Sequence, residues 1–470
     1  MQTFLWHDYE TFGKNTRTAR PAQFAAIRTD MDLNEIGAPL EVFCQPAPDF
    51  LPEPEACLIT GITPQHCLKN GVPEHEFAAI IEKAFAQPDT IGVGYNTIRY
   101  DDEITRFMFW RNLIDPYARE WQNGCSRWDI IDLARVTYAL RPDGIEWPRN
   151  EQGKISFKLT DLTAANGISH IGAHDAVSDV RATIALARLI KSKQPKLFEF
   201  YFKLRQKDAV NDEIALHVQP RQAFLHLSSM FPSERAHMAL VYPLAQHPTN
   251  KNEIIVWDCA FDPSELAGLD AAAIKQRMFT RADELPEGVA RLPIKTIHTN
   301  KSPVVIRNLK VLDAAAQARC ALDLELNLRH ATIAQSLAQV EWSAVFARDF
   351  EPSDVDESLY SGFVGNNDRR LLNQLRVLSP QALAAAQPSF SDSRLTELLF
   401  RYRARNHPDT LNEDEFDAWQ QHCAQRLHGG AGGALTLTDF FAQLEALATE
   451  DNVAVLQDLH DYAYMIAPEG

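Results

Sequence analysis

Apolar and polar positions divide the chain into three regions, each with its own pattern. Residues 1–194 alternate short apolar runs, beginning with Thr3-Phe4-Leu5-Trp6, with longer segments of helical spacing. Short apolar runs bounded by polar residues are typical of buried strands, and alternation with helices favours a sheet covered by helices. The pattern predicts an α/β fold, with strands over 3–6, 24–27, 41–44 and 91–95 and helices over 74–86, 101–113, 127–140 and 174–193.

The middle region, residues 195–348, contains short β-like runs separated by Pro, Asn and Gly. Many short strands with such turn residues between them are typical of small barrels and sandwiches. This region predicts a barrel-like β domain with inserted helices, with strands that include 214–218, 223–227, 238–244 and 254–257.

The last region, residues 349–470, is rich in Leu and Ala at helical spacing. Leu395, Leu398, Leu399 and Tyr402 fall at i, i+3, i+4 and i+7, which is one face of a helix. We therefore expect a helical bundle here, and three domains in all with boundaries near 194 and 348.

Composition is ordinary for a globular protein, but the charge is uneven. The 46 Lys+Arg and 63 Asp+Glu give a formal net charge of −17. The basic and acidic counts are 20 and 26 over 1–194 (net −6), 18 and 17 over 195–348 (net +1), and 8 and 20 over 349–470 (net −12). The total argues against broad adhesion to duplex DNA, but it allows a narrow groove for one strand. We expect a basic cleft and an acidic outer surface on the last region.

The seven cysteines include no C-x-x-C pair, which argues against a disulfide framework or a structural zinc site. Scattered single cysteines fit a reducing compartment. The N-terminus lacks the pattern of a signal peptide, and no apolar run approaches the roughly 18 residues of a membrane span. We expect a soluble cytoplasmic protein with no membrane partner.

Acidic residues follow the first predicted strand. Asp8 and Glu10 are two positions apart, so on an extended chain both carboxylates point to one face. Hard divalent cations such as Mg²⁺ take oxygen ligands. A D-x-E sequence alone is more often a solvated strand end, so further acids must support the metal interpretation.

Two later segments supply further candidates. Asp101 follows the strand predicted at 91–95 and opens a helix, where the alternative role is helix capping. His174 and Asp179 begin another amphipathic helix. Asp179 could reach a metal, and a His with a near-neutral pKa is a natural general base for activating water. The alternative is an acidic helix start that complements the helix dipole.

Together these segments form a specific pattern. Asp8-x-Glu10, Asn96-x-x-x-Tyr100-Asp101 and His174-x-x-x-x-Asp179 resemble the motifs of the DEDDh 3′–5′ exonucleases. The stretch Leu58–Pro64 resembles the lining of that superfamily's nucleotide pocket. Four further segments are similar to the bacterial exonuclease I family over essentially the whole chain: His7–Gly13, Arg20–Arg28, Ser126–Asp129 and Tyr402–Asn406.

The resemblance implies an RNase H-like DEDDh exonuclease domain (1–194), an SH3-like domain (195–348) and a C-terminal helical domain (349–470). It further implies a monomer that degrades single-stranded DNA from the 3′ end to 5′-mononucleotides, in DNA repair and recombination. The expected protein partner is single-stranded-DNA-binding protein, whose C-terminal tail is acidic and hydrophobic, and Arg141 is one candidate contact.

Hydrolysis of a phosphodiester suits two metal ions, because charge grows on the attacking and the leaving oxygen. We assign Asp8, Glu10 and Asp179 to Mg²⁺ binding, with Asp8 as the bridge, and Asp101 to the second ion, partly through water. Mn²⁺ is the expected substitute. His174 is assigned to take the proton from water, and Glu10 and Asp101 are counted with it as catalytic.

A single strand also needs stacking and phosphate contacts. The predicted substrate-binding residues are Glu10, Arg106, Tyr117, Trp121, Arg135, Lys158 and Lys301. For the aromatic residues the alternative is a place in the core, and for Lys301 it is a solvated surface. Lys158 stands where the family has Arg, which keeps the charge but loses bidentate phosphate contact.

Arg401, Arg403 and Arg405 lie close together in an otherwise acidic region. They fit either a phosphate contact or a structural ion-pair network, and the sequence leaves both open.

Two other functions compete with a DNA exonuclease. An RNA exonuclease of the same superfamily would carry the same site residues. A module that binds DNA without cutting it is a second alternative, which the five filled motif positions argue against.

Overall fold

The structure is a computed structural model, and it describes residues 1–170, 175–337, 340–347 and 354–468. The chain forms two compact units. The first comprises residues 1–126, 170–181 and 350–470, and the second comprises 127–169 and 182–349. The first unit therefore joins the beginning and the end of the chain, which cuts across the three predicted regions.

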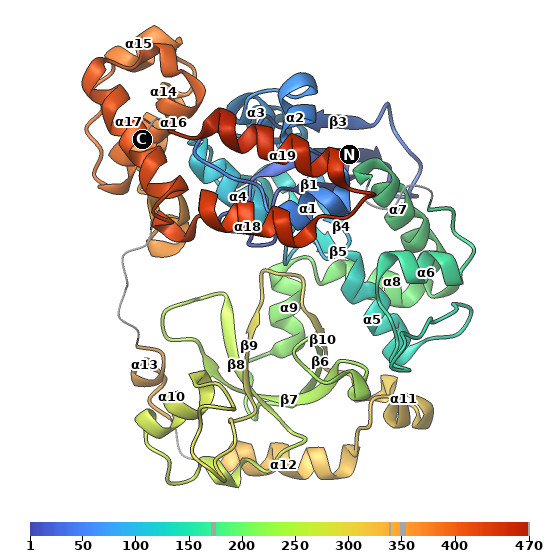
Figure 1. Cartoon of the computed structure of the whole chain (residues 1–470). Helices are drawn as coiled ribbons and strands as arrows, with labels where there is room; N and C mark the ends of the chain where they lie inside the picture. The colour runs from blue at the N-terminus through green and yellow to red at the C-terminus, as the bar shows by residue number, and fades with distance from the viewer. Residues whose placement is uncertain (171–174, 338–339, 348–353, 469–470) are drawn as a thin grey trace. The chain divides into compact units, whose positions relative to one another are not determined.

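A mixed five-stranded sheet organises the N-terminal part, with strand order β3-β2-β1-β4-β5. β1 pairs antiparallel with β2 and parallel with β4, so it lies in the middle of the sheet (Figure 1). Its first residues, Phe4, Leu5 and Trp6, are buried, which explains the continuous apolar run. The strands are β1 (Thr3–Thr11), β2 (Pro21–Thr29), β3 (Leu40–Phe43), β4 (Thr90–Gly94) and β5 (Ser126–Asp129).

β1 is longer than predicted. The pairing with β2 continues to Thr11, with a register shift between Glu10 and Thr11. Asp8 and Glu10 therefore lie inside the strand rather than after it. The sequence hid this because polar residues usually end a buried strand, whereas here the backbone of β2 keeps the strand in place.

Short helices cover this sheet: α1 (Pro54–Thr60), α2 (Pro64–Asn70), α3 (Glu74–Phe85) and α4 (Asp101–Arg111). The last two confirm the predicted helices. α1 ends at Gly61, whose φ of 70° is the left-handed conformation that glycine adopts without strain. α2 begins with Thr63 as N-cap and Pro64 in its first turn. The stretch 58–64 is therefore the short connection between α1 and α2, with the end of one helix and the start of the other.

The C-terminal helices complete the first unit. They are η6 (Val355–Ser361), α14 (Asn366–Leu375), α15 (Pro380–Ala385), α16 (Arg394–Asn406), α17 (Glu413–Leu427), α18 (Leu437–Leu447) and α19 (Val453–Ile466). The predicted apolar face of α16 is confirmed, because Leu395, Leu398, Leu399 and Tyr402 are buried.

These helices share their core with the N-terminal part. Phe12, from the end of the β1 segment, belongs to one apolar cluster with Phe440 of α18 and Leu459 of α19. In a second cluster Trp110 of α4 packs with Leu398 of α16. α18 and α19 both contact α1 (Figure 1). The last region is helical as predicted. Its helices pack on one another, as Ala404 of α16 does with Trp419 of α17, and also on the N-terminal part.

The second unit contains an antiparallel sheet with strand order β10-β6-β7-β8-β9. Its strands are β6 (Phe224–Leu227), β7 (Met238–Gln246), β8 (Glu253–Asp258), β9 (Ile294–His298) and β10 (Val304–Ile306). Around it lie α5 (Ile130–Leu140), α6 (Leu159–Ala165), α8 (Pro195–Lys203), α9 (Lys207–Ile214), α10 (Ala271–Phe279), α11 (Ala314–Arg319), α12 (Leu324–Ser336) and α13 (Trp342–Val345). α7 (Ala176–Lys193) begins in the first unit and continues into the second.

One predicted strand of this part was wrong, and one predicted helix begins later than expected. Residues 214–218 are not a strand, because α9 runs to Ile214 and ends at Ala215 in the left-handed conformation. The helix predicted from 127 begins only at Ile130, because residues up to Asp129 form β5 and the Asp129 carboxylate caps the helix at Ile131 N. Among the described residues, no helix is both long and apolar enough to cross a membrane.

Candidate active site

The central strand and one helix start bring three carboxylates together. Asp8 and Glu10 lie two residues apart on β1, and Asp179 lies in the first turn of α7. One oxygen from each of the three side chains lies within 4.8 Å of the other two. Oxygen ligands at this spacing suit a hard divalent cation. The metal interpretation of D-x-E is therefore supported by a third acid, distant in sequence.

The electrostatics of the group favour a cation. Burial, followed by the charge of Asp179, raises the pKa of Asp8 to about 8. Burial, followed by the charges of Asp8 and Asp179, raises the pKa of Glu10 to about 9. Buried carboxylates that repel one another resist ionisation unless positive charge is supplied. A bound dication would supply it, so the residues fit a metal ion.

Asp101 lies beside this group on the first turn of α4. Its Oδ1 accepts a hydrogen bond from the backbone N–H of Tyr9 at 3.1 Å. Burial and then the charge of Asp8 raise the pKa of Asp101. The Asp101 carboxylate therefore joins α4 to β1 at Tyr9, which lies between Asp8 and Glu10. This contact with the strand is not helix capping, which was the alternative role.

Hydroxyl groups fasten the end of β1 to α4. The Tyr100 and Thr11 hydroxyls are 2.7 Å apart, and the Tyr100 hydroxyl donates to the Gly13 carbonyl at 2.9 Å. The Thr105 hydroxyl of α4 donates to the Tyr9 hydroxyl of β1 at 3.0 Å. These bonds fix the backbone that carries the acids, and no periodic pattern in the sequence marks them.

His174, the predicted general base, lies outside the described residues, and its role stays a prediction. His170, four positions earlier, is described: its Nε2 contacts Oδ1 of Asp179. Sequence reasoning missed His170, because only the spacing of His174 matches the motif. The signal available was a second His shortly before the same acid.

The predicted DNA-contact residues of the first unit differ in exposure. Trp121 is 63% exposed, as a stacking surface requires. The Tyr117 ring lies 6.1 Å from that of Phe363, and Phe363 is 84% exposed. Phe363, which the sequence analysis did not single out, therefore extends this aromatic surface. It lies between helices, where no periodicity marks it.

Arg106 is less exposed to solvent than a predicted phosphate contact would be. Its guanidinium is buried and pairs with Glu120 at 2.7 Å and Glu103 at 2.6 Å, and it lies over the Tyr117 ring at 5.4 Å. Here it supports the aromatic surface, and a direct phosphate contact stays a prediction.

In the second unit, Arg135 pairs with Asp132 at 2.9 Å and lies over the Phe157 ring at 5.9 Å. Lys158 is exposed and precedes α6, and Lys301 is partly exposed. Their contacts with DNA stay predictions.

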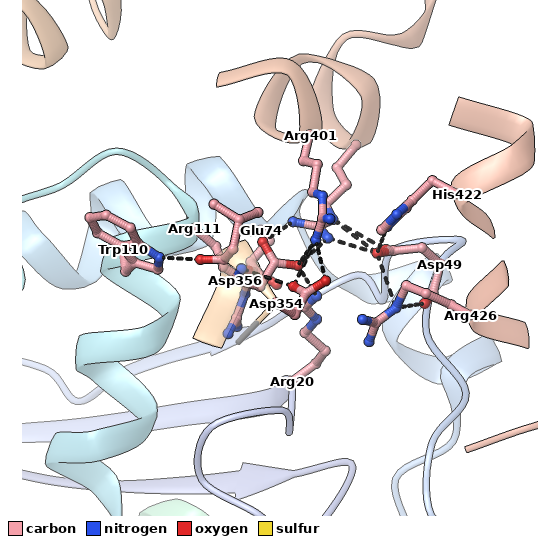
Figure 2. Close-up of polar contacts among 12 residues, drawn as sticks. Arg20, Asp49, Glu74, Trp110, Arg111, Asp354, Asp356, Arg401, His422 and Arg426 are labelled. Atoms are coloured by element: carbon pink, nitrogen blue, oxygen red, sulfur yellow. Dashed lines mark hydrogen bonds and ion pairs between the residues drawn. The ribbon is translucent and has the colours of Figure 1, made fainter. Parts of the chain in front are cut away.

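Arg401, Arg403 and Arg405 form the ion-pair network that was one of the two alternatives. The Arg405 guanidinium pairs with Asp49 and Asp356, both buried. Arg401 pairs with Asp354 at 2.7 Å, as Figure 2 shows. Arg403 pairs with Glu415 at 2.7 Å. All three guanidinium groups thus form ion pairs within the first unit.

Three family models match the chain in sequence order. Residues 5–187 match a model described as Exonuclease, 205–350 match the Exonuclease I SH3-like domain, and 353–466 match the Exonuclease I C-terminal domain. Exodeoxyribonuclease I of Escherichia coli (strain K12) is 43% identical over 473 aligned positions, which cover 98% of this chain and 97% of the relative.

Several solved structures align with 99% of this chain, and each alignment covers 100% of the solved chain. Exonuclease I from Methylocaldum szegediense has a TM-score of 0.93 at 47% identity. E. coli Exonuclease I in complex with a dA16 oligonucleotide has a TM-score of 0.92 at 41% identity, as does a zinc-ion-bound E. coli ExoI–ssDNA complex. An SSB/Exonuclease I structure in complex with the inhibitor CFAM has a TM-score of 0.91 at 40% identity. The chain therefore belongs to the exonuclease I family.

Proposed function

We propose that this protein is a metal-dependent 3′–5′ exonuclease that degrades single-stranded DNA to 5′-mononucleotides, with a role in DNA repair and recombination. The observation that carries the proposal is the convergence of Asp8, Glu10 and Asp179 within 4.8 Å, in a chain whose relatives are exodeoxyribonucleases. Single-stranded DNA is the proposed substrate, because related structures hold single-stranded oligonucleotides.

Two Mg²⁺ ions are the proposed cofactor, with Mn²⁺ as a substitute, and Asp8, Glu10, Asp101 and Asp179 would hold them. When bound, such ions stabilise charge on both the attacking and the leaving oxygen of a phosphodiester. The zinc-bound form of a relative supports a metal requirement without identifying the ion used here.

The protein's own groups position the reaction. The Tyr9 N–H holds the Asp101 carboxylate, and the Tyr100 hydroxyl holds the end of β1. His174 is proposed to accept the proton of the attacking water, and Glu10 to contact the terminal nucleotide. Such a general base contributes about 10²–10⁴-fold in rate.

The strand is proposed to stack on Trp121, Tyr117 and Phe363, since aromatic faces bind bases without reading sequence. Arg106 supports the Tyr117 ring. Arg135, Lys158 and Lys301 are proposed phosphate contacts. The Lys at 158, where the family has Arg, provides charge without the fork of a guanidinium.

A pocket in the second unit supports the proposed partner. A cavity of about 570 Å³ is lined by Arg141, Lys196, Leu197 and Phe200, among others. Cationic side chains beside apolar ones suit a peptide that ends in acidic and hydrophobic residues, such as the tail of single-stranded-DNA-binding protein. We also propose a monomer in the cytoplasm; the seven cysteines are buried and free, which supports a reducing compartment.

Digestion of labelled oligonucleotides tests the proposal. Single-stranded DNA labelled at either end, duplex DNA and RNA are incubated with the protein, with and without EDTA. We expect release of mononucleotides from the 3′ end of single-stranded DNA, abolished by EDTA. Faster loss of RNA would make the protein an RNA exonuclease, and no release with any substrate would favour the binding module.

A matched pair of variants links the reaction to the site. Asp8→Asn should lose the activity, whereas Asp461→Asn, at a carboxylate whose side chain is 64% exposed, should keep it. Equal activity of wild type and Asp8→Asn would show that the digestion comes from another source.

A further inference from the structure

His170 contacts a carboxylate of the candidate metal site from outside the three-acid group. Its Nε2 lies against Oδ1 of Asp179, and the His170 side chain is only 6% exposed, compared with 19% for Asp179. Both residues belong to the first unit, together with Asp8 and Glu10. A buried imidazole is therefore aimed at one oxygen of a proposed metal ligand.

The start of α7 does not need Asp179 for capping. The Asp175 carboxylate accepts from Ser178 N at 3.1 Å, and the Asp175 carbonyl accepts from Asp179 N at 3.0 Å. Asp175 thus caps the first turn. The carboxylate of Asp179 lies near the acids of β1 and contacts the ring of His170.

Repulsion from Asp8 and Glu10 does not by itself orient the Asp179 carboxylate toward an ion that the three acids would share. With its proton on Nε2, the His170 ring donates to Oδ1 of Asp179, and this bond limits rotation of the carboxylate. Donors of this kind, behind the ligands of a metal, commonly orient them, and their loss costs about 10- to 100-fold in metal affinity or activity.

We propose that His170 is a positioning residue that orients the Asp179 carboxylate for the metal ion. The proposal rests on the proposed function, because it assigns Asp179 to a metal site. It gives His170 a role distinct from that of His174: His170 acts through Asp179, and it neither touches substrate nor accepts the proton of water.

Metal binding measured without substrate tests this role. Mn²⁺ is titrated into the full-length protein by calorimetry, and the Mg²⁺ concentration for half-maximal nuclease rate is measured alongside. His170→Phe keeps a ring but removes the N–H, and it should weaken Mn²⁺ binding and raise the Mg²⁺ requirement by about 10- to 100-fold. His170→Gln, whose amide reaches the position of Nε2, should restore both to within a few-fold of wild type.

Two controls keep the result interpretable. His460→Phe changes a half-exposed His on α19 and should leave both readouts unchanged. His170→Asn places its amide at the position of Nδ1 and should behave like His170→Phe, which provides a second comparison if the larger ring unfolds the protein.

Unchanged Mn²⁺ affinity in His170→Phe and His170→Asn would overturn the proposal while leaving the proposed function intact. So would equal weakening in all three His170 variants, because the residue would then matter for packing rather than for its N–H. If instead wild type neither binds Mn²⁺ nor degrades DNA, the proposed function itself fails.

Discussion

Two groups of buried carboxylates in the first unit differ in how their charge is balanced. At the candidate active site, burial and neighbouring acids raise the pKa values of Asp8 and Glu10 to about 8 and 9. In the network of Figure 2, burial alone would raise the pKa of Asp49, but Arg405, His422 and Arg20 hold it well below its ordinary value.

The difference separates acids that are paired with cations from acids that repel one another. Asp49 and Asp356 meet Arg405 within the protein, so their charge is balanced on folding. Asp8 and Glu10 lie beside further acids, and a bound cation would balance their charge. A shifted carboxylate pKa alone does not mark a functional site, because structural ion-pair networks also shift pKa values. The better indicator is buried negative charge that no cationic side chain balances.

The largest effect should come from removing an acid of the unbalanced group. Asp8→Asn should lower the rate of nucleotide release by at least about 10²–10⁴-fold, as severe as losing a general base. Its free energy of unfolding without metal should not fall, because a repelling charge is gone. Rates on a 3′-labelled strand and urea melts check both; a variant that is unfolded as well as inactive would contradict the comparison.

Stability should instead fall when a partner is removed from the ion-paired acids Asp49 and Asp356. Arg405→Met leaves Asp49 and Asp356 buried without their shared cation, and removing one partner of a buried pair costs about 3–5 kcal/mol. Urea denaturation measures this loss. Arg281→Met is the control, because Arg281 pairs with Asp283 at a surface where its side chain is 74% exposed, and should cost under about 1 kcal/mol.

The pH dependence of stability should differ in sign between the groups. The folded-state pKa values of Asp8 and Glu10 are raised, so the metal-free folded protein binds more protons and loses stability as pH rises from about 4 to about 9. Asp49 has a lowered pKa, so its contribution is present above pH 4 and is lost as pH falls further.

We expect a decline of several kcal/mol between pH 5 and 8 in EDTA, because each group with a raised pKa costs about 1.4 kcal/mol per pH unit across this range. Glu10→Gln should flatten it, and Mg²⁺ should suppress it in wild type only. Thermal melts across this range measure the slope; a rise in stability from pH 5 to 8 without metal would contradict the assigned sign.

The smallest effect concerns the aromatic surface, which lies outside both groups. Trp121→Ala should weaken binding of single-stranded DNA by about 1–3 kcal/mol without changing the stability of the fold, because the ring is 63% exposed. Fluorescence anisotropy with EDTA present isolates binding from cleavage. Trp128→Ala, at a fully buried ring, should instead destabilise the protein.

Motif spacing, which is local to each segment, singled out Asp8, Glu10 and Asp179, and the structure brings these three acids together. Their role in metal binding stays a prediction. The sequence could not show that Asp8 and Glu10 lie within β1, since the support comes from pairing with β2. His170 and Phe363 were missed because neither has a periodic or motif position. The alternatives for Arg401, Arg403 and Arg405 were decided by acids as distant as Asp49, which no local pattern connects to them.

The third region was correctly predicted as helical, but the sequence did not show that part of its core is shared with the N-terminal part. Apolar positions on a helix show that a face is buried, and they do not say which element buries it. Here neighbouring C-terminal helices and the N-terminal part both do so, and Trp110 and Phe12 contribute to clusters that the C-terminal helices fill.

The shared core around Phe12 also sets an order of events during synthesis. Phe12 leaves the ribosome early, yet its packing partner Leu459 follows roughly 450 residues later. At about 5–20 residues per second, this interval lasts tens of seconds. Until α18 and α19 emerge, Phe12 and its N-terminal neighbours lack part of the apolar cluster that buries them in the folded protein. The first unit therefore finishes folding only after the last helices are made.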